Sequence, residues 1–307
     1  MANKSPKISI VTPVFNRAHV IGHAIETVQA QTVSDWEMII VDDCSTDEIK
    51  AAIAPISAAD PRIRLIRRET NGGPSGARNT GVDAASGDFI AFLDSDDHWA
   101  PEKLDQQLAA VESLPDQSAA FCVTKTNVVY GDGRGDQVLP ERGVTEGERW
   151  GTFLYVANQF AQCSSFFLSA ALAARISFDE TLRQYEDHLY FLAAGGAGGQ
   201  YVLVDAPLVT WQNDARADRM GATDSTERGA AFLARAGALL TETEALAFQV
   251  RCLGPTLAHQ SRGKALRLAM KARTDAGLPR EAWVKLMAQG LIGPGGYNRL
   301  RSLLSRG

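Results

Sequence analysis

Apolar and polar residues follow a regular order along the first 115 residues, where short apolar runs are separated by segments of helical spacing. Each apolar run spans four to eight residues between polar or turn-forming residues, which is typical of a buried strand. Between the first two runs, Ile21, Ile25 and Val28 recur at helical spacing. The pattern predicts strands over 7–14, 36–41, 63–66 and 89–93, and helices over 17–31, 45–56, from 74 onward and over 102–113.

Three local signals define where these elements begin and end. Pro13 marks the end of the first strand, because proline cannot donate a hydrogen bond to a central strand ladder. Ser45 and Glu48 have the spacing of a capping box, which predicts that the second helix begins there. Pro74 follows a glycine-rich turn and suits the first position of the third helix.

Four successive strand–helix pairs predict an α/β fold with a mostly parallel sheet and helices on both faces. In such a sheet the carboxyl ends of the strands share one edge, and ligands bind at that edge. Thr12-Pro13, Asp42-Asp43 and the acidic segment 94–97 follow three of the predicted strands. We therefore expect these residues to lie at the ligand-binding edge.

The rest of the chain alternates less regularly. The segment 131–149 is rich in glycine and charge, and 213–227 has few apolar residues, so both are predicted as loops. We expect an α/β domain over 1–215 and a helical, basic extension over 216–307. Further strands are predicted over 119–130, 164–168 and 201–204 with a pre-turn segment over 207–211, and helices over 172–175, 186–194, 229–248, 255–272 and 280–288.

Charge is distributed unevenly over the 307 residues. The chain has a formal net charge of -5, but the part from Arg251 onward holds 11 lysines and arginines against two acids, Asp275 and Glu281, which gives 11 - 2 = +9. Residues 1–250 therefore carry -14. This asymmetry indicates an acidic body with a basic face near the C-terminus.

Composition limits the class of protein. The hydrophobic content of 45% is that of an ordinary globular protein, and no run approaches the roughly 18 apolar residues of a membrane span. The first residues lack the pattern of a signal peptide. The four cysteines lie far apart without metal-ligand spacing, so we expect reduced thiols in a cytoplasmic protein.

The segment DFIAFLDSDD, residues 88–97, places Asp94, Asp96 and Asp97 directly after a buried strand. Crowded carboxylates repel one another. A Mg²⁺ or Mn²⁺ ion held by these oxygen ligands and bridged to a diphosphate would neutralise the repulsion. The alternative is a turn whose carboxylates are simply solvated.

Other candidate residues also have two interpretations. Asp42 either accepts a hydrogen bond from a base or ribose, or caps the following turn. Arg78 either pairs with phosphate or with the acids, or lies on the surface. Phe15 either stacks on a base or belongs to the core. Glu186 and Asp187 either supply a general base or interact with the dipole at a helix N-terminus.

The chain resembles the family 2 glycosyltransferases of GT-A fold in four motifs, which are SIVTPVFNRA at 9–18, VDDCSTD at 41–47, NGGPSGARNTGVDAASGDFIAFLDSDD at 71–97 and YEDHLYFLAAGG at 185–196. The resemblance covers roughly residues 1–212. It implies an inverting transfer of a sugar from a nucleotide diphosphate donor, usually a UDP-sugar, to an acceptor hydroxyl. It also implies Mn²⁺ or Mg²⁺ as cofactor.

The resemblance assigns roles to particular residues. Asp187 would be the catalytic base, with Glu186 beside it in the acceptor site, and Asp96 would ligate the metal ion. Asp94 would face the ribose and the donor sugar. The nucleotide-binding residues that it implies are Thr12, Pro13, Phe15, Asp42, Arg78, Asp94 and Ser95.

Two departures from the family pattern bear on these roles. Many relatives follow the late strand with an aromatic-Arg-x-His pattern, whereas this chain has WQND at 211–214. In those relatives the His or Arg of this pattern reaches the diphosphate or the metal ion. Asp214 and Arg216 are the candidates to replace it in this chain. Phe15 stands where a tyrosine is common, so a hydroxyl contact to the nucleotide is absent.

The resemblance points to bacterial cell-surface or exopolysaccharide synthesis, with a saccharide or lipid-linked saccharide as acceptor and no nucleic-acid partner. Two other functions remain open, a sugar-phosphate nucleotidyltransferase and a non-catalytic nucleotide-sugar-binding protein. The first usually carries a glycine-rich, basic phosphate loop after its first strand, where this chain has TPVFNRA. The basic helices over 262–304 either contact the inner face of the cell membrane through anionic lipids or pack on the catalytic domain.

Overall fold

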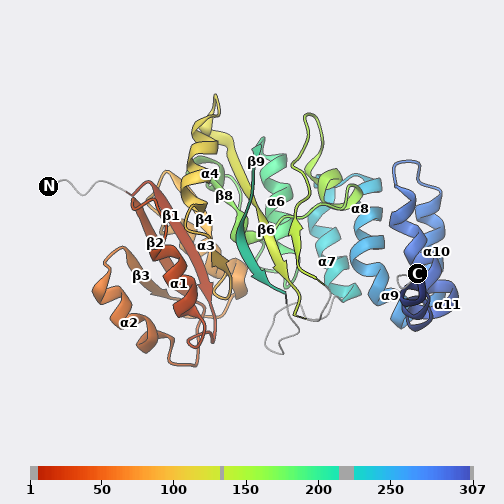
Figure 1. Ribbon diagram of the computed structural model, residues 1–307, viewed down its shortest axis with the longest axis horizontal. Coiled ribbons are helices and arrows are strands. Elements are labelled where there is room, and N and C mark those ends of the chain that lie inside the picture. Colours follow the sequence, from red (N-terminus) through yellow and green to blue (C-terminus); the bar gives the residue numbers. More distant parts are fainter. Residues whose placement is uncertain (1–5, 132–134, 214–224, 305–307) are drawn as a thin grey trace. The chain divides into compact units, whose positions relative to one another are not determined.

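The computed structural model describes residues 6–131, 135–213 and 225–304 (Figure 1). Its contacts divide the chain into two compact units. The first unit comprises Met1–Glu146 and Phe160–Arg216, and the second comprises Gly147–Gln159 and Ala217–Gly307. The division into an α/β domain over 1–215 and a helical extension over 216–307 stays a prediction from the sequence.

One mixed sheet organises the first unit. Within the described residues, nine strands form this sheet in the order β3-β2-β1-β4-β8-β6-β9-β5, and β7 pairs with β6. β1 to β4 are parallel to one another, whereas β8 runs antiparallel to both β4 and β6. The strands are β1 (Ile8–Val14), β2 (Trp36–Asp42), β3 (Ile63–Arg67), β4 (Phe89–Phe92), β5 (His98–Trp99), β6 (Ala120–Val129), β7 (Gln137–Leu139), β8 (Phe167–Ser169) and β9 (Gln200–Gln212).

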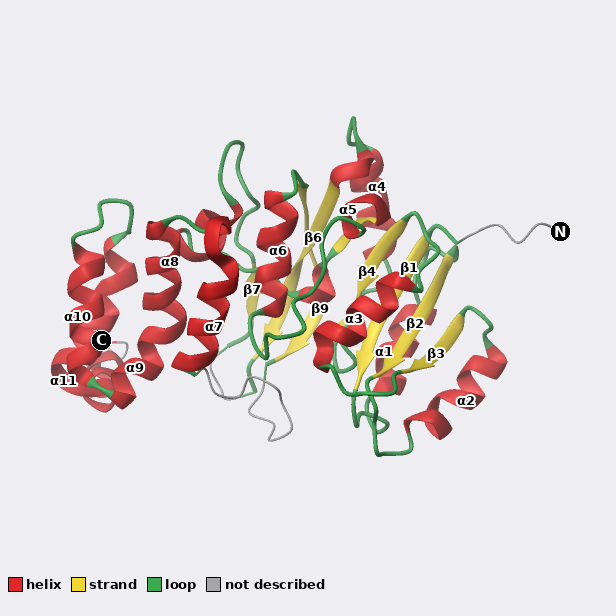
Figure 2. Ribbon diagram, turned by 180° about the vertical axis from the view of Figure 1, so that it is seen from behind, coloured by secondary structure: helices red, strands yellow, loops and turns green. Residues whose placement is uncertain are grey.

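Helices cover both faces of this sheet, as the two opposite views in Figures 1 and 2 show. One face of β1, with Ile8, Ile10 and Val14, packs in the main core with residues of α1, α2 and α4. On the opposite face of the sheet, α3 packs against β1 and α6 packs against Phe92, the last residue of β4. The helices of this unit are α1 (Ile21–Gln29), α2 (Ile49–Ala59), α3 (Gly73–Asp83), α4 (Lys103–Glu112), α5 (Ala170–Ala173) and α6 (Glu186–Gly196).

Helix α3 approaches the sheet closely because of a glycine. A Cβ atom at Gly81 would lie 2.3 Å from Cγ1 of Val11 on β1, so only glycine allows this spacing. On α6, the ring of Tyr190 meets the ring of Phe92 edge to face with centroids 5.6 Å apart. These contacts fix α3 and α6 against the central strands, and both helices carry candidate site residues.

Several boundaries differ from those that the sequence predicts. β1 ends at Val14 as predicted, and it accommodates Pro13 because β4 ends opposite Val11 and leaves that side of β1 without a ladder partner. β9 is one continuous strand with a register irregularity instead of a strand and a separate segment. β5 was not predicted, since it is only two residues long, and β7 forms in the predicted loop 131–149.

The predicted capping box at Ser45 and Glu48 is wrong. Helix α2 begins at Ile49, with Glu48 at the N-cap and no side-chain cap. The hydroxyl of Ser45 instead accepts a hydrogen bond from the backbone N–H of Asn16 at 2.9 Å. A long-range contact between two loops therefore replaces the local cap.

The second unit is helical, and Glu244 joins its two segments. This buried carboxylate accepts hydrogen bonds from Arg149 at 3.0 Å and from Thr152 at 2.7 Å, and it forms a capping box with Thr241. Residues 149–156 are thereby attached to the later helices. The helices are α7 (Thr226–Ala236), α8 (Glu242–Phe248), α9 (Gly254–Gln260), α10 (Arg262–Arg273) and α11 (Arg280–Leu304).

The long helices predicted over 229–248 and 255–272 are each interrupted. Gly237 has a positive φ of 41°, which ends α7, and Ser261 is extended and caps α10 through Lys264 N. In the part of the chain that the structure describes, we find no helix with the length and apolarity that a membrane crossing requires.

Candidate active site

Arg78 connects the two acidic motifs at the carboxyl edge of the sheet. It lies on α3 and its residue is only 3% exposed. One guanidinium nitrogen contacts Oδ1 of Asp94 at 2.6 Å, and the other contacts Oε1 of Glu186 at 3.3 Å. The structure thus excludes the alternative that Arg78 is a surface residue. It brings Arg78 together with Glu186, which lies 108 positions further along the chain.

Glu186 and Asp187 open helix α6 in a position where their charge is disfavoured. Burial is the main cause that raises the pKa of Asp187 to about 6, while the nearby Arg78 partly offsets it. The pKa of Glu186 is also raised, by burial first and then by the charge of Asp187. Tyr185, just before them, has a φ of 65°, and such left-handed residues are frequent at active sites. Asp187 therefore has the properties of a general base that is ionised at neutral pH.

Asp97, the last of the three aspartates after β4, is buried among hydrogen-bond donors. It is 1% exposed, and its Oδ2 accepts hydrogen bonds from Ser164 Oγ and from Gln162 Nε2, each at 2.6 Å. Burial, followed by the charges of Asp94 and Asp96, raises the pKa of Asp97 well above its usual range. Burial of Asp97 therefore favours its uncharged form, and Asp94 is paired with Arg78.

Ser164 also fixes the backbone of the acidic turn. Its hydroxyl accepts a hydrogen bond from the backbone N–H of Asp94 at 2.9 Å, and its carbonyl accepts one from Trp99 Nε1 at 2.9 Å. The segment before β8 thus holds both ends of the turn that carries Asp96. We did not identify Gln162 and Ser164 from the sequence, where a short polar run before an apolar strand was their only signal.

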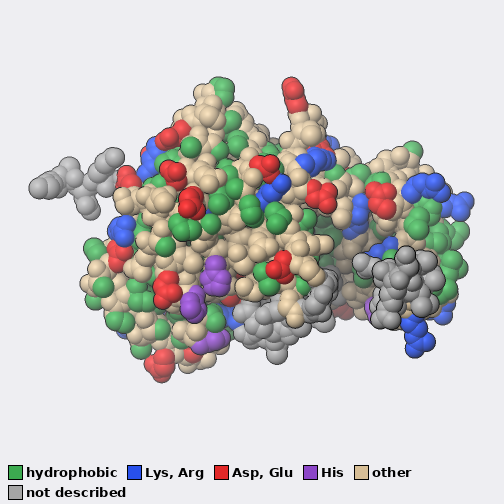
Figure 3. Space-filling model, viewed as in Figure 1, with side chains coloured by type: hydrophobic (Ala, Val, Ile, Leu, Met, Phe, Trp, Pro, Cys, Tyr) green, Lys and Arg blue, Asp and Glu red, His purple; other side chains and the backbone are tan. Residues whose placement is uncertain are grey.

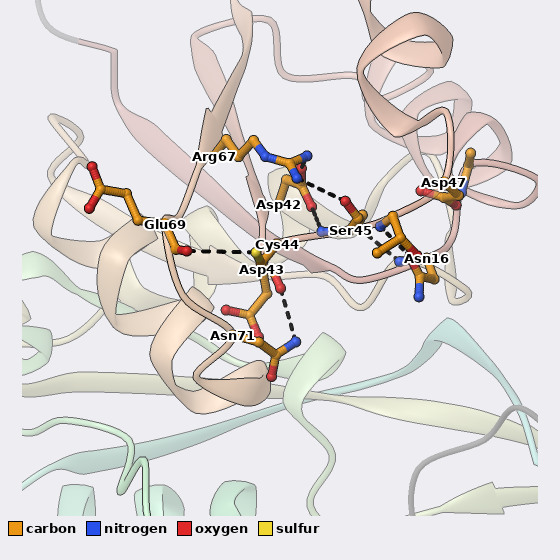
Figure 4. Close-up of polar contacts among 11 residues, drawn as sticks. Asn16, Asp42, Asp43, Cys44, Ser45, Asp47, Arg67, Glu69 and Asn71 are labelled. Carbon is orange, nitrogen blue, oxygen red and sulfur yellow. Dashed lines mark hydrogen bonds and ion pairs between the residues drawn. The ribbon is translucent and has the colours of Figure 1, made fainter.

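Asp42 and Asp43, after β2, have separate structural partners (Figure 4). Asp42 is fully buried, and its two oxygens accept from Arg67 at 2.6 Å and from the backbone N–H of Ser45 at 2.8 Å. Asp43 accepts from the backbone N–H of Gly73 at 2.7 Å, so it caps α3 instead of the helix that follows it in sequence. A nucleotide contact of Asp42 stays a prediction.

The loop after β1 contacts the loop after β2. Thr46 N donates to Oδ1 of Asn16, and Ala18 N donates to Asp47, both at 2.8 Å (Figure 4). Asn16 and Cys44 have positive φ values of 53° and 71°. These contacts shape the edge where the sequence places the nucleoside.

The predicted residues near the end of β1 differ in exposure. Phe15 is 45% exposed, so it is not a core residue and its ring is available to a ligand. Thr12 is fully buried, and its hydroxyl has no hydrogen-bond partner among the described residues. Pro13 is half-buried and Ser95 is buried. Asp214 and Arg216 lie outside the described residues.

The donor set at this edge fits a hard divalent cation only in part. Carboxylates are suitable ligands for Mg²⁺ and Mn²⁺, and Asp96 lies half-buried in the acidic turn. Among the described residues, however, no group of three or more His, Cys, Asp or Glu could hold a metal ion. An ion at Asp96 would take most of its ligands from water and substrate phosphates, as is usual for Mg²⁺.

Comparison with known proteins decides the family. The model of the family described as "Glycosyl transferase family 2" matches residues 9–180, which is more than half of the chain. The chain belongs to glycosyltransferase family 2. This confirms the resemblance in the four sequence motifs, three of which the matched region contains in full.

Similar proteins include three bacterial glycan-biosynthesis proteins. The amylovoran biosynthesis glycosyltransferase AmsB of Erwinia amylovora is 32% identical over 211 residues, which cover 68% of this glycosyltransferase and 70% of AmsB. The succinoglycan biosynthesis protein ExoO of Rhizobium meliloti is 34% identical over 64% of this chain and 58% of ExoO. WfgD of Escherichia coli, a UDP-Glc:alpha-D-GlcNAc-diphosphoundecaprenol beta-1,3-glucosyltransferase, is 43% identical over 33% of this chain and 40% of WfgD. The alignment thus spans less than two thirds of ExoO and WfgD.

Solved structures share the fold. TarS 1–349 of S. aureus, in complex with UDP-GlcNAc, matches with a TM-score of 0.63 and 19% identity over 92% of this chain and 91% of that one. The mannosyltransferase PcManGT of Pyrobaculum calidifontis, in complex with GDP-Man and Mn²⁺, matches with a TM-score of 0.54 and 16% identity over 99% of this chain and 75% of that one. This glycosyltransferase therefore has the α/β GT-A fold with a helical C-terminal region, as the sequence predicts.

Proposed function

We propose that this glycosyltransferase transfers a sugar from a UDP-sugar to an acceptor hydroxyl with inversion of configuration. The observation that carries the proposal is the cluster of Asp94, Arg78, Glu186 and Asp187 at the carboxyl edge of the sheet. Arg78 binds Asp94 and Glu186 together, and Asp187 follows Glu186 with a pKa of about 6. The acidic turn and the helix N-terminus that carries the base are thus joined by a single guanidinium.

Asp187 is the general base in this proposal. Its carboxylate accepts the proton of the acceptor hydroxyl as the acceptor oxygen forms its bond to the anomeric carbon of the donor. The bond between that carbon and the diphosphate oxygen breaks, and the diphosphate leaves with the bonding electrons. One displacement from the opposite side inverts the configuration. Arg78 keeps Asp94 and Glu186 in place during this step.

The donor site comprises Thr12, Pro13, Phe15, Asp42, Arg78, Asp94 and Ser95. The exposed ring of Phe15 offers a flat surface to the base, whereas Thr12 is fully buried at the end of β1. TarS, which shares the fold, was solved with UDP-GlcNAc, and the name of WfgD specifies UDP-Glc. These similarities support UDP as the nucleotide.

Asp96 would hold Mn²⁺ or Mg²⁺, and the ion would neutralise the negative charge that develops on the leaving diphosphate. PcManGT, which has the same fold, was solved with Mn²⁺. Asp94 is paired with Arg78 and Asp97 is fully buried, whereas Asp96 is half-buried, so Asp96 is the acid of this turn best suited to the role.

The acceptor is a saccharide or a lipid-linked saccharide of a bacterial polysaccharide. AmsB and ExoO are named for the synthesis of amylovoran and succinoglycan, and the acceptor in the name of WfgD is a diphosphoundecaprenol-linked sugar. A sugar-phosphate nucleotidyltransferase would instead release pyrophosphate from UTP and a sugar phosphate. A non-catalytic binding protein would bind UDP-sugar without turnover.

Removal of the carboxylate of Asp96 should abolish metal-dependent activity. We expect Asp96→Ala to lower Mn²⁺-stimulated hydrolysis or transfer of UDP-sugars by at least about a hundredfold, because metal stabilisation of the leaving group contributes several kcal/mol. The matched control is Asp88→Ala, since Asp88 lies exposed before the same strand and should leave the rate unchanged. An Asp96→Ala enzyme that Mn²⁺ still activates as in wild type would contradict the assignment, and pyrophosphate release would favour the nucleotidyltransferase.

The rate should also follow the ionisation of Asp187. The pKa of about 6 is above the usual value, and only the deprotonated base accepts a proton. The specificity constant kcat/KM reports the ionisation of the free enzyme, so it is expected to rise with pH through about 6 and to level off above about 7. The measurement is kcat/KM against pH, with thermal unfolding recorded at each pH. A profile that stays flat from about pH 5 to 8 would exclude Asp187 as the base.

A further inference from the structure

Exposed apolar side chains concentrate on two helices of the second unit. Six large hydrophobic residues are exposed among the described residues, and four of them lie on α10 and α11. These four are Met270 (59% exposed), Val284 (46%), Leu291 (59%) and Ile292 (48%). The other two are Phe15 and Val138, which belong to the first unit. Such a concentration on one pair of helices is unlike the scattered single residues of an ordinary surface.

The two helices form a hairpin that keeps these residues on its outside. The guanidinium of Arg262, at the start of α10, donates to the backbone carbonyls of Gly290 and Leu291 on α11. Gly290 permits a close approach, because a Cβ there would lie 2.6 Å from Cγ of Leu266. The inward positions of α10 are alanines, namely Ala265, Ala269 and Ala272. The inner faces are therefore packed, and the four apolar residues are not needed for that packing.

Exposed cations lie close in sequence to the apolar residues on both helices. Lys264, Arg267, Lys271 and Arg273 flank Met270 on α10, and Lys285 follows Val284 on α11. Within the described residues, none of these five side chains forms a salt bridge. Over 262–297 the chain has seven lysines and arginines and two acids. One of the acids, Asp275, accepts hydrogen bonds from Thr243 and from the backbone of Gly277. The cations of this surface are Lys264, Arg267, Lys271, Arg273 and Lys285.

We propose that this hairpin surface, formed by Met270, Val284, Leu291, Ile292 and the five cations, docks on an anionic lipid bilayer. Apolar residues flanked by lysine and arginine are typical of helices that lie in the membrane interface, where the apolar side chains enter the acyl boundary and the cations contact acidic headgroups. An acidic soluble polymer would use the cations but not the apolar side chains. Figure 3 shows hydrophobic and basic side chains next to each other over this part of the chain.

A neighbouring aromatic residue fits the same partner. Trp283 precedes Val284 and is half-buried, and tryptophan is favoured at the level of lipid headgroups. The inference concerns binding alone and is independent of the proposed sugar transfer. A lipid-linked acceptor, if that part of the proposed function holds, would reside in the membrane to which the hairpin binds.

The test is co-sedimentation of the full-length protein with vesicles. The protein is expected to bind phosphatidylcholine vesicles that contain phosphatidylglycerol, and to remain in the supernatant with phosphatidylcholine alone or at high salt. Replacing two cations, in Arg267→Gln with Lys271→Gln, should weaken binding by about thirtyfold, since each cation near the surface contributes about fivefold. Val284→Glu should weaken it by at least about tenfold, through lost apolar burial and charge repulsion.

The control is Val138→Glu, because Val138 is also a valine with 46% exposure but lies on β7. It should bind vesicles as wild type does, and circular dichroism establishes that each variant is folded. Equal binding by Val284→Glu and Val138→Glu would overturn the proposal, and so would the absence of binding to anionic vesicles.

Binding to acidic polymers that the cation variant loses and Val284→Glu retains would instead identify a soluble acidic partner. Asp187→Asn should bind vesicles as wild type does, which separates this test from that of the catalytic proposal.

Discussion

Asp187→Asn is expected to lower the rate of sugar transfer by about a hundredfold to ten-thousandfold, the range for loss of a general base. The same substitution should make the protein more stable. The pKa of Asp187 is raised to about 6 in the folded protein, so its ionised form disfavours folding at pH 7. Asparagine has the same shape, still accepts the bond from His188 N and carries no charge. The expected gain in the free energy of unfolding is about 1–3 kcal/mol at pH 7.

The pH dependence of this gain provides the check. Protonation of Asp187 removes the unfavourable charge, so the difference between the two proteins should shrink as pH falls through about 6 and vanish below about 4. Urea unfolding of both proteins across this range measures it. Asp83→Asn, on the exposed surface of α3, is the control and should change neither rate nor stability. A fully active Asp187→Asn enzyme would eliminate Asp187 as the base, whatever its stability.

Arg78→Met is expected to impair both folding and catalysis. The substitution leaves Asp94 and Glu186 without the cation that neutralises them, and breaking a buried ion pair by removing one partner typically costs about 3–5 kcal/mol. Because the two carboxylates are partly exposed, we expect a loss of about 3 kcal/mol at pH 7. The loss should be smaller near pH 4.5, where protonation neutralises part of the acidic cluster. Activity should fall at least as far as in Asp187→Asn, since the donor-facing turn and the helix N-terminus that carries the base lose their common anchor.

Two further variants separate charge from geometry. Arg78→Lys keeps the positive charge but cannot contact Asp94 and Glu186 with one planar group, so its stability should lie between those of wild type and Arg78→Met. Lys125→Met removes an ion pair with Asp205, which is 75% exposed, and should cost less than about 1 kcal/mol. If Arg78→Met were as mild as Lys125→Met, Arg78 would not be the anchor of the site.

The sequence determined the local elements and the edge where they end. Apolar runs of strand length, with helical spacing between them, predicted β1 to β4 and the helices after each. Asp42 and Asp94 were predicted at strand ends because carboxylates that directly follow a buried strand lie at the carboxyl edge of a parallel sheet. These predictions depend on neighbours within a few residues, and that is the range over which periodicity and turn chemistry act.

Local signals were misleading where a distant group supplied the hydrogen bond. Ser45 has the spacing of a capping box, but its hydroxyl accepts from Asn16 of another loop, so α2 begins at Ile49 without a side-chain cap. Asp43 caps α3, thirty residues further along, and not the helix that follows it. Sequence spacing shows which hydrogen bonds are available locally but not which competing partner the fold brings closer.

The charge states of the site were decided by the tertiary structure alone. The sequence shows several acids and one arginine, but it does not show that Arg78 contacts Asp94 and Glu186 at once or that Ser164 and Gln162 surround Asp97. The pKa of a carboxyl group depends on its burial and on charges within a few ångströms, and both arise only when α3, β4, β8 and α6 are packed together. The sequence thus determined which acids stand at the edge of the sheet. The packing of these elements decided which of the acids is paired with Arg78, which is enclosed by hydrogen-bond donors and which has a pKa raised to about 6 by burial.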